Sequence, residues 1–251
     1  MMDVFTLTDR GSFRPDNQDS CLARDVAGGK LLVVCDGMGG RAGGRVASEL
    51  ACAEFADFTG MALEASGGGD AAPILRDAAA RANMVVFDRA CVEPGLSGMG
   101  TTLVALYAAD RTVTVLNVGD SRCYRIRGGA LTQLTHDHSV VQEMLDEGQL
   151  TADEALRHPD RNLITRALGV ERFVRSDVFE SAAEVGDIFL LCTDGLSGYL
   201  PEEDILRAAS EARDAAGLCR LLVEEALARR SRDNITAAVL IVNGKDGTQR
   251  E

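Results

Sequence analysis

The chain has 251 residues, of which 46% are hydrophobic and 26% are charged, and its formal net charge is −13. This length and apolar content can supply a substantial core in one large domain or two small ones. The negative charge argues against nucleic acid as a partner, because phosphates would be repelled, whereas clustered carboxylates still attract divalent cations.

The first residues lack a basic segment followed by an apolar stretch, and no apolar run approaches the roughly 20 residues that cross a membrane. The chain never forms a Cys-x-x-Cys pair. Its seven cysteines are Cys21, Cys35, Cys52, Cys91, Cys123, Cys192 and Cys219. Most lie within apolar runs, so we expect small buried thiols and a reducing, cytoplasmic location without secretion or membrane association.

In the first part of the chain, runs rich in Val, Leu, Ile and Thr predict strands before a pair of helices. The strands are Val4–Thr8, Ser20–Arg24 and Leu31–Cys35. Two long helical patterns follow at Gly43–Phe58 and Ala71–Cys91, separated by the turn-forming residues Ala-Ser-Gly-Gly-Gly-Asp.

The second part of the chain predicts hairpins and a second helix pair. Strands are expected at Thr101–Tyr107, Thr112–Val118, Arg122–Arg127, Phe173–Phe179, Ile188–Cys192 and Ile235–Val242, and helices at Glu202–Glu211 and Asp214–Arg229. The first two strands flank Ala-Ala-Asp-Arg, and the third reaches Leu131 through two glycines. Such short connections force neighbouring strands to be antiparallel. Helix pairs around hairpin-connected strands indicate a layered α+β sandwich.

One polar segment, residues 140–161, interrupts the strand-rich pattern. It has helical character and two interpretations. It is a helical excursion on the surface, or a mobile flap beside the functional site. Because no linker or repeat is evident, we predict a single domain over residues 1–251 that carries this flap-like insertion.

Four aspartates stand where apolar strands stop or begin: Asp36, Asp120, Asp194 and Asp233. A carboxylate at a strand end beside glycine is poorly placed for packing but well placed to converge with others on a hard cation. Oxygen ligands favour Mg²⁺ or Mn²⁺ over Zn²⁺. The pattern therefore predicts a site for more than one such ion.

The stretch Asp-Gly-Met-Gly-Gly-Arg-Ala-Gly-Gly that begins at Asp36 permits an alternative. Gly37-x-Gly39-x-x-Ala42 lies between a strand and a helix, as in the dinucleotide-binding fingerprint. An aspartate directly before the first glycine is an awkward neighbour for a pyrophosphate, and no second parallel strand follows the first helix. We expect these glycines to serve the close approach of a metal ion instead.

Several separated motifs resemble those of the metal-dependent serine/threonine protein phosphatases of type 2C in their compact bacterial form. The motifs are Arg-Pro-Asp-Asn-Gln-Asp-Ser, Asp-Gly-Met-Gly-Gly, Ser-Gly-Met-Gly-Thr-Thr, Asn-Val-Gly-Asp-Ser-Arg, Leu-Thr-His-Asp-His-Ser, Asn-Leu-Ile-Thr-Arg-Ala-Leu-Gly, Cys-Thr-Asp-Gly and Ser-Arg-Asp-Asn-Ile-Thr. The likeness runs from about Asp9 to Val242. It implies a four-layer αββα sandwich of two antiparallel sheets flanked by helix pairs.

The resemblance also implies a metal site. Asp36 matches the aspartate that bridges two ions, and Gly37 matches the glycine whose carbonyl binds the second ion. Asp194 and Asp233 match the remaining ligands of the first ion. Asp120 matches an aspartate that joins Asp194 around a third ion in bacterial members.

Three further residues acquire roles from the same resemblance. Asp19 matches an acidic residue that orders metal-bound water. Arg14 matches the guanidinium that holds the substrate phosphate, a group whose fork fits phosphate oxygens better than a lysine does. Asn234 is expected to orient Asp233, although an Asp-Asn turn before a strand would have the same sequence. Thr101 and Thr102 are expected to be structural.

Three positions depart from the family pattern. At one of them, Arg45 replaces a common acidic residue. Animal members carry a histidine two residues after the bridging aspartate, where this chain has Met38. Many bacterial members carry a histidine after Asp-Gly-Met-Gly-Gly, where this chain has Arg41. The proton donor for a leaving group is therefore open, and we expect His138 to be a structural hydrogen-bonding residue.

The resemblance implies that phosphoserine and phosphothreonine on proteins are hydrolysed by a metal-activated water. The cofactors would be two Mn²⁺ or Mg²⁺ ions, together with a more weakly bound third ion as in bacterial members. The implied setting is a cytoplasmic monomer that opposes a serine/threonine kinase. Two alternatives stay open: a non-catalytic metal- or partner-binding module of the same fold, suggested by Met38 and Arg41, and, more distantly, a dinucleotide-binding oxidoreductase.

Overall fold

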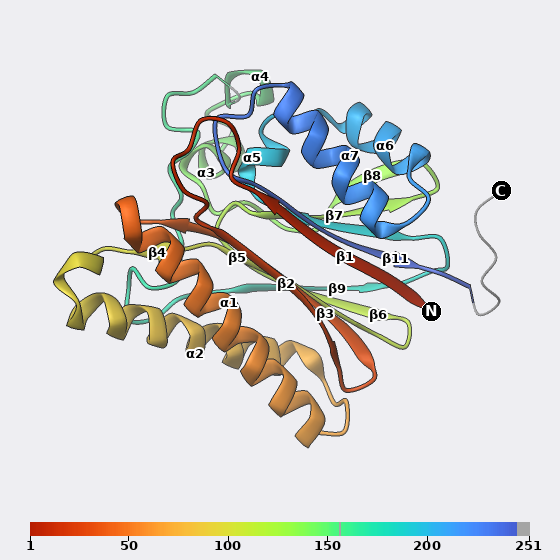
Figure 1. Ribbon diagram of the computed structural model, residues 1–251, viewed down its shortest axis with the longest axis horizontal. Helices are drawn as coiled ribbons and strands as arrows, with labels where there is room; N and C mark the ends of the chain where they lie inside the picture. The colour runs from red at the N-terminus through yellow and green to blue at the C-terminus, as the bar shows by residue number, and fades with distance from the viewer. Residues whose placement is uncertain (156, 245–251) are drawn as a thin grey trace.

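Two antiparallel β-sheets lie face to face in the computed structural model, which describes residues 1–155 and 157–244 apart from the side chains of residues 41 and 42 (Figure 1). The first sheet has the order β1 (Met2–Asp9), β11 (Ile235–Val242), β10 (Ile188–Cys192), β7 (Arg122–Arg127) and β8 (Ala130–Gln133). The second has the order β2 (Asp19–Val26), β3 (Gly29–Met38), β5 (Leu103–Ala109), β6 (Thr112–Val118) and β9 (Asp177–Ala182), and the short β4 (Gly100–Thr101) pairs with β3.

A pair of helices covers the outer face of each sheet, one below and one above the sheets in the view of Figure 1. The second sheet is covered by α1 (Gly40–Ala65) and α2 (Ala71–Val92), and the first by α6 (Glu202–Glu211) and α7 (Ala215–Ala228). The shorter helices are η1 (Pro94–Leu96), α3 (Val140–Asp146), α4 (Ala152–Ala155) and α5 (Asp194–Ser197). The predicted α+β class and the four-layer αββα order are confirmed.

The layers explain why β3 is an uninterrupted apolar run. Its residues Leu31, Val33 and Cys35 pack against the helices α1 and α2. The intervening Leu32 and Val34 pack into the core between the two sheets. Because successive side chains of a strand point to opposite faces, a strand that is covered on both faces needs apolar residues at every position. A third core fills the space between the first sheet and the helices α6 and α7.

The antiparallel registers bring the polar strand ends together. Asp19 at the start of β2 is the register partner of Asp36 in β3. Asp233 precedes the first residue of β11, which pairs with β10, and Asp194 follows the end of β10. The chain therefore delivers carboxylates from distant segments to one end of the sandwich.

Several predicted elements need correction. The strand expected at Phe173–Phe179 begins only at Asp177, because the pairing with β6 ends at the partner pair Asn117 and Asp177. Phe173 lies outside the sheet with 81% of its surface exposed. The first helix extends beyond the predicted Gly43–Phe58 at both ends.

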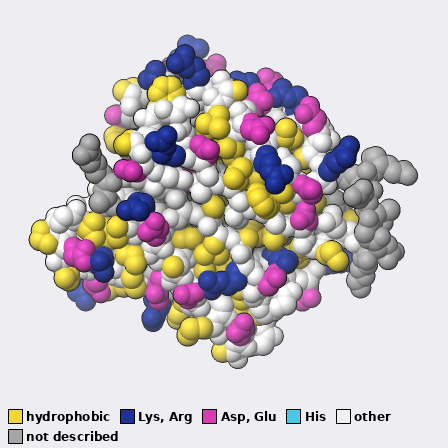
Figure 2. Space-filling model, in the orientation of Figure 1, with side chains coloured by type: hydrophobic (Ala, Val, Ile, Leu, Met, Phe, Trp, Pro, Cys, Tyr) yellow, Lys and Arg dark blue, Asp and Glu magenta, His cyan; other side chains and the backbone are white. Residues whose placement is uncertain are grey.

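The cysteines are unpaired, and all seven lie in the described residues. Five are buried as predicted, but Cys21 is half-buried and Cys91 is exposed near the end of α2. Within the described ranges, no helix is long and apolar enough to cross a bilayer. Acidic and basic side chains are interspersed with apolar ones over the face shown in Figure 2.

The segment 140–161 contains α3, α4 and turns between them, while residue 156 lies outside the described residues. Its first helix is capped by Ser139, whose hydroxyl accepts a hydrogen bond from the Gln142 amide at 3.3 Å. The segment leads directly into Asn162 and Ile164, which line the pocket described below. That it moves as a flap, and that the chain is one domain, remain predictions.

A buried amide fastens the loop after this segment to α2. The Asn83 side chain is 1% exposed, accepts a hydrogen bond from the Gly169 amide at 2.8 Å, and donates to the carbonyls of Glu171 and Arg172 at 3.0 Å each. Such a side chain satisfies main-chain groups that water cannot reach.

We expect Asn83→Ala to lower the free energy of unfolding by about 1–3 kcal/mol, because it leaves buried polar groups of the loop without partners. Urea unfolding measures this change. The matched control is Asp77→Ala on the exposed face of the same helix, which should stay within about 0.5 kcal/mol of the parent protein. Equal stability of the two variants would contradict this account of the loop.

Candidate active site

The predicted carboxylates converge on one pocket of about 430 Å³ at the end of the sandwich. Its lining includes Asp36, Gly37, Asp120, Asp194, Asp233, Arg14 and Asn234. Met38, Asn162 and Ile164 complete one side. Asp19 is buried next to this lining, as the register partner of Asp36. The structure thus brings together every site residue that was expected from the sequence.

Threonine side chains hold the main chain of Asp36 in place. The Asp36 amide donates to Thr102 Oγ1 at 2.9 Å, and the Asp36 carbonyl accepts from the Thr102 amide and from Thr101 Oγ1, both at 2.9 Å. Thr102 Oγ1 also lies 2.7 Å from the hydroxyl oxygen of Ser121, the residue after Asp120. The two threonines therefore have the expected structural role, and they also connect the loops of two pocket carboxylates.

Gly37 allows three segments to meet at the pocket. A Cβ atom at this position would lie 2.0 Å from the carbonyl oxygen of Gly44 and 2.5 Å from that of Gln18. No side chain fits between these backbones, so only glycine permits this approach. The steric requirement explains the glycine without reference to any ligand.

The pocket concentrates negative charge in a buried place. Burial, followed by repulsion from the other carboxylates, raises the pKa of Asp36 well above its ordinary value. The same two causes raise the pKa of Asp120 to about 7 and that of Asp194 to about 6. Burial also raises the pKa of Asp19 to about 7, although hydroxyls of Thr236 and Thr193 donate to its Oδ2 at 2.6 and 3.0 Å.

These carboxylates fit hard divalent cations. Asp19 Oδ1 and Asp194 Oδ1 are buried without a hydrogen-bond partner. Buried anionic oxygens without partners are costly unless a cation compensates them. In the part of the chain that the structure describes, no three acidic, imidazole or thiol side chains are already arranged as a ligand set. Mutual repulsion opposes such an arrangement in the absence of a cation, and the oxygen chemistry of the site suits Mg²⁺ or Mn²⁺.

Arg14 lies at the mouth of the pocket with 52% of its side chain exposed. Its Nη2 atom is 2.5 Å from Asp233 Oδ2. The hydrogen bond to Asp233 raises the pKa of the guanidinium, so this group remains cationic. It supplies the positive charge at the open side of an otherwise acidic site.

Asn234 contacts Asp233 differently from the expectation. Its main-chain amide, not its side chain, donates to Asp233 Oδ1 at 2.9 Å. Its side-chain oxygen accepts from the Gln18 amide at 2.8 Å, and its side-chain nitrogen donates to the carbonyls of Arg10 and Asp16 at 2.8 and 3.0 Å. The side chain therefore fastens the loop that carries Arg14. No sequence signal reveals this role, because the contacts join residues more than 200 positions apart.

The turn before Asp120 is held by His138. Gly119 donates its amide hydrogen to His138 Nδ1 at 3.0 Å, and the His138 amide donates to the Gly119 carbonyl at 3.0 Å. Because Nδ1 accepts, the neutral ring carries its hydrogen on Nε2 and donates to Asp177 Oδ2 at 3.1 Å. Arg166 Nη1, which lies 3.0 Å from the same nitrogen, donates to Asp177 Oδ1 at 3.2 Å. His138 is 3% exposed and does not line the pocket, in agreement with the structural role expected from the sequence.

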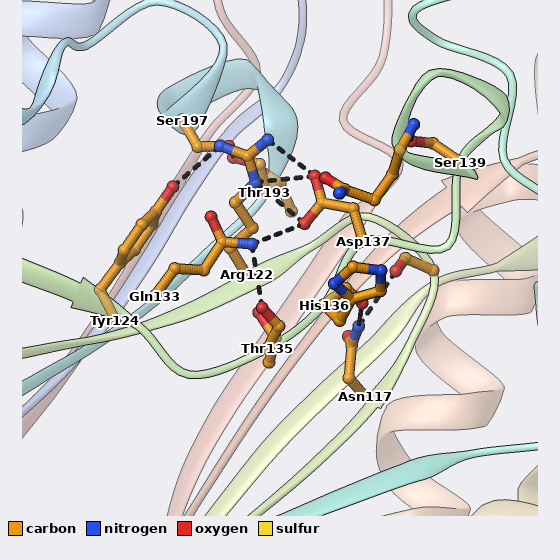
Figure 3. Close-up of polar contacts among 12 residues, drawn as sticks. Asn117, Arg122, Tyr124, Gln133, Thr135, His136, Asp137, Ser139, Thr193 and Ser197 are labelled. Atoms are coloured by element: carbon orange, nitrogen blue, oxygen red, sulfur yellow. Dashed lines mark hydrogen bonds and ion pairs between the residues drawn. The ribbon is translucent and has the colours of Figure 1, made fainter. Parts of the chain in front are cut away.

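Figure 3 shows the ion pair between Arg122 and Asp137, the residue before His138 in the sequence. The Arg122 guanidinium makes three hydrogen bonds to the Asp137 carboxylate, at 2.7, 2.9 and 3.1 Å, and donates a fourth to Tyr124 Oη. The Gln133 amide donates to Asp137 Oδ1 at 2.9 Å. A nearby hydrogen bond from Asn117 Nδ2 to the His136 carbonyl, at 3.0 Å, joins the segment that contains His136 and Asp137 to β6. The Asp120 turn is consequently supported on both sides.

Of the departures from the family pattern, Met38 lines the pocket, while the side chain of Arg41 lies outside the described residues. Among the described lining residues there is no imidazole, thiol or amine. The lining therefore offers neither the expected histidine acid nor the nucleophilic side chain that a covalent mechanism through cysteine or histidine needs.

The dinucleotide-binding alternative is wrong. Each strand pairing in the described part of the chain is antiparallel, including those of β3 with β2 and β5. A dinucleotide fold requires β3 to continue through its helix into a neighbouring parallel strand. The glycines after Asp36 instead allow close contact between backbones.

Comparisons with known proteins agree with this geometry. The sequence model of the protein phosphatase 2C family matches residues 14–231. The serine/threonine protein phosphatase PstP of Mycobacterium tuberculosis is 41% identical over 97% of this chain, which spans 46% of that protein's length. The serine/threonine phosphatase stp of Listeria monocytogenes is 36% identical over 97% of this chain and 96% of its own. The crystal structure of the PstP catalytic domain in complex with two manganese ions superposes with a TM-score of 0.86 and 37% identity, covering 97% and 99% of the two chains.

We expect a His138→Asn variant to lose less stability in acid than the parent protein. Burial, reinforced by the Arg166 guanidinium, lowers the pKa of His138 below its ordinary value of 6.5, despite the hydrogen bond to Asp177. The unfolded chain therefore binds the proton more readily, and stability falls as the pH drops through 6.5 towards the folded-state pKa. Asparagine retains an acceptor oxygen for Gly119 but does not titrate.

Urea unfolding between pH 8 and pH 5 tests this expectation. At pH 8 the variant should be about 1 kcal/mol less stable, and its decline on the acid side should be flatter. The exposed His136→Asn variant is the matched control, and it should keep the steep decline of the parent. Parallel curves for all three proteins would show that His138 does not titrate with unfolding.

Proposed function

This chain belongs to the protein phosphatase 2C family, and on that basis we propose that it hydrolyses phosphoserine and phosphothreonine on proteins with the help of Mn²⁺ or Mg²⁺. The observation that carries the proposal is the convergence of the strand-end aspartates Asp36, Asp120, Asp194 and Asp233 and of one exposed arginine on a single pocket. The chain spans about half the length of the first relatives it matches. The activity of the whole protein is therefore part of this proposal.

In the proposal, Asp36, the Gly37 carbonyl, Asp194 and Asp233 would hold two ions. Asp120 would join Asp194 in holding a third. The ions would neutralise phosphate charge and activate water for direct attack on phosphorus. Asp19, which is held by two threonine hydroxyls, faces this set from the side of β2 and would orient the water. These assignments are supported by the buried, partnerless oxygens of Asp19 and Asp194.

Arg14 is proposed to hold the substrate phosphate. Its guanidinium is exposed at the pocket mouth and needs only to exchange the Asp233 carboxylate for phosphate oxygens. The planar fork of arginine suits such oxygens. Asn234, by fixing the loop of residues 10–18, would restrict where that fork can lie. An exposed cation at the mouth of an acidic pocket is otherwise difficult to explain by packing.

The expected cellular setting is also part of the proposal. Unpaired cysteines, five of them buried, suit a reducing cytoplasm. A serine/threonine kinase would supply the phosphoproteins that this enzyme consumes, and the enzyme would act as a monomer. The relatives named above are serine/threonine phosphatases by name.

A non-catalytic metal-binding module of the same fold is the competing function. Met38, and the absence of an imidazole among the described lining residues, favour it. The complete set of carboxylates argues against it, because a module without turnover has no need to retain an arginine facing buried aspartates. Phosphate release from a phosphothreonine peptide in Mn²⁺, with and without EDTA, separates the two.

We expect Asp194→Asn to lower the rate of this reaction by more than about 100-fold, since even groups that only orient metal ligands contribute about 10- to 100-fold. The change keeps the size of the side chain and removes its charge. Asp110→Asn is the matched control, because Asp110 is exposed in a turn at φ 53°, a conformation that asparagine tolerates. It should leave the rate unchanged. Activity of the Asp194 variant equal to that of the control would refute the proposed metal site.

The segment 140–161 is proposed to act as a flap beside the pocket. Asn162 and Ile164, which follow the segment directly in the sequence, belong to the pocket lining. The Val140 amide donates to the Leu163 carbonyl at 2.9 Å, which ties the entry of the segment to its exit. A segment closed at its base in this way can move without disturbing the sheets.

Deletion of residues 144–156, whose last residue lies outside the described ranges, should therefore change activity on phosphoproteins more than activity on a small aryl phosphate. A large substrate contacts the surface beside the pocket, whereas a small one needs only the pocket. Steady-state rates on both substrates measure the effect. Comparable losses on both would mean that the segment is only scaffold.

A further inference from the structure

A second hollow of about 290 Å³ continues from the pocket. The two share Met38 and Ile164, so the hollow is an extension of the same cleft. Beyond these residues it is lined by Thr165, Arg166, Ala167, Val170, Glu171, Phe173, Val174 and Arg175. We call it the Phe173 groove. It lies on the opposite side of Met38 from the carboxylates and has no part in the chemistry proposed above.

The groove has a fixed floor. Leu168 and Thr101 exchange two main-chain hydrogen bonds, of 2.8 and 3.0 Å. These bonds attach the loop of residues 165–175, which lines the groove, to β4. From the other side, Asn83 of α2 holds Gly169, Glu171 and Arg172. Gly100 lies close to the side chains of Met38 and Val170. A Cβ atom added at Gly100 would be only 2.8 Å from a methyl carbon of each. The loop is therefore preorganised by contacts with two elements of the fold.

This fixed loop presents apolar side chains to solvent. Phe173 is 81% exposed and Val170 is 48% exposed. Val174, the residue after Phe173, packs against the core between α1, α2 and the second sheet. An aromatic side chain that is held outward by an anchored loop contributes little to folding, and exposed aromatics of this kind are enriched where proteins bind other proteins.

The groove lining carries two arginines and one glutamate, in a chain with a net charge of −13. Because Arg166 is bonded to Asp177, Arg175 is the more exposed of the two cations. The Arg175 side chain is 81% exposed, and its Nε atom is 3.9 Å from Asp177 Oδ1, a distance at which little of its charge is compensated. The Arg172 guanidinium lies over the Phe173 ring at 6.0 Å. The groove thus combines an apolar surface with exposed positive charge.

We propose that the Phe173 groove binds the stretch of substrate polypeptide next to the phosphorylated residue, and that it selects an apolar side chain accompanied by a carboxylate. This proposal rests on the phosphatase function proposed above. Continuity with the catalytic pocket through Met38 and Ile164 means that one extended peptide can occupy both. Phe173 and Val170 would contact the apolar side chain, and Arg175 would pair with the carboxylate.

The test compares phosphothreonine peptides of one length that carry a single Leu, at each position from the fifth before to the fifth after the phosphorylated residue, with or without a neighbouring Glu. We expect one position on one side at which Leu raises kcat/KM. Phe173→Ala should remove that preference and lower kcat/KM on the preferred peptide by about 10-fold, as for other aromatic contacts at interfaces. The matched control is Val185→Ala, an apolar residue that is 69% exposed in the turn beside the last residue of β11.

Charge reversal supplies an independent variant. Arg175→Glu should lower kcat/KM on the Glu-containing peptide by about 10-fold and raise it on the same peptide with Lys in place of Glu. Hydrolysis of p-nitrophenyl phosphate should be unchanged in all of these variants, because this substrate does not reach the groove. If the parent protein fails on p-nitrophenyl phosphate and on every peptide in Mn²⁺, the phosphatase function itself fails.

Other outcomes overturn the groove alone. If the parent protein hydrolyses both kinds of substrate but shows no positional preference, the groove does not bind substrate. The same holds if the preference survives in both Phe173→Ala and Arg175→Glu. The remaining candidate occupant is a second copy of the chain, and light scattering tests for it by measuring the oligomeric state. A dimer in the parent protein that dissociates in Phe173→Ala would show that a second copy of the chain, not a peptide, fills the groove.

Discussion

The structure depends on keeping several carboxylates close together in a buried place. Burial and mutual repulsion raise the pKa values of Asp19, Asp36, Asp120 and Asp194, which means that the folded chain holds these groups against an electrostatic cost. A protein that gained nothing from this arrangement would place an apolar or neutral residue at these strand ends. The cost is intelligible when cations offset it, and the antiparallel registers are what make the convergence unavoidable.

The framework around the carboxylates is mostly neutral. Threonines hold the main chain of Asp36, His138 in one tautomer holds the turn before Asp120, and Asn234 holds the loop that carries Arg14. Because these contacts are directed at main-chain groups, they set position without consuming the carboxylate oxygens. Of the two arginines near the carboxylates, Arg122 is bonded to Asp137, and Arg14 at the mouth is bonded to Asp233 Oδ2. Asp19 Oδ1 and Asp194 Oδ1 have no hydrogen-bond partner and are available to a cation.

Under the two proposals, chemistry and selectivity occupy different parts of the cleft. The pocket contains groups that suit any phosphate ester, and nothing in its lining distinguishes one protein substrate from another. The residues beyond Met38 provide shape, apolar surface and positive charge, and they belong to a loop that is fixed by Asn83 and β4. A reaction centre that is separate from the surface that contacts the substrate lets one fold serve many substrates. The segment 140–161 leads into the same loop.

The sequence alone determined the layers and the identity of the carboxylates. Continuous apolar runs such as Leu31–Cys35 signal strands covered on both faces, and polar residues at the ends of such runs have no packing role. These are local signals. Only the tertiary structure decided that the Asn234 side chain holds the loop that carries Arg14. It also decided that β9 begins at Asp177 and that Phe173 faces solvent. Each depends on a partner distant in the sequence, and local patterns carry no information about which distant groups will meet.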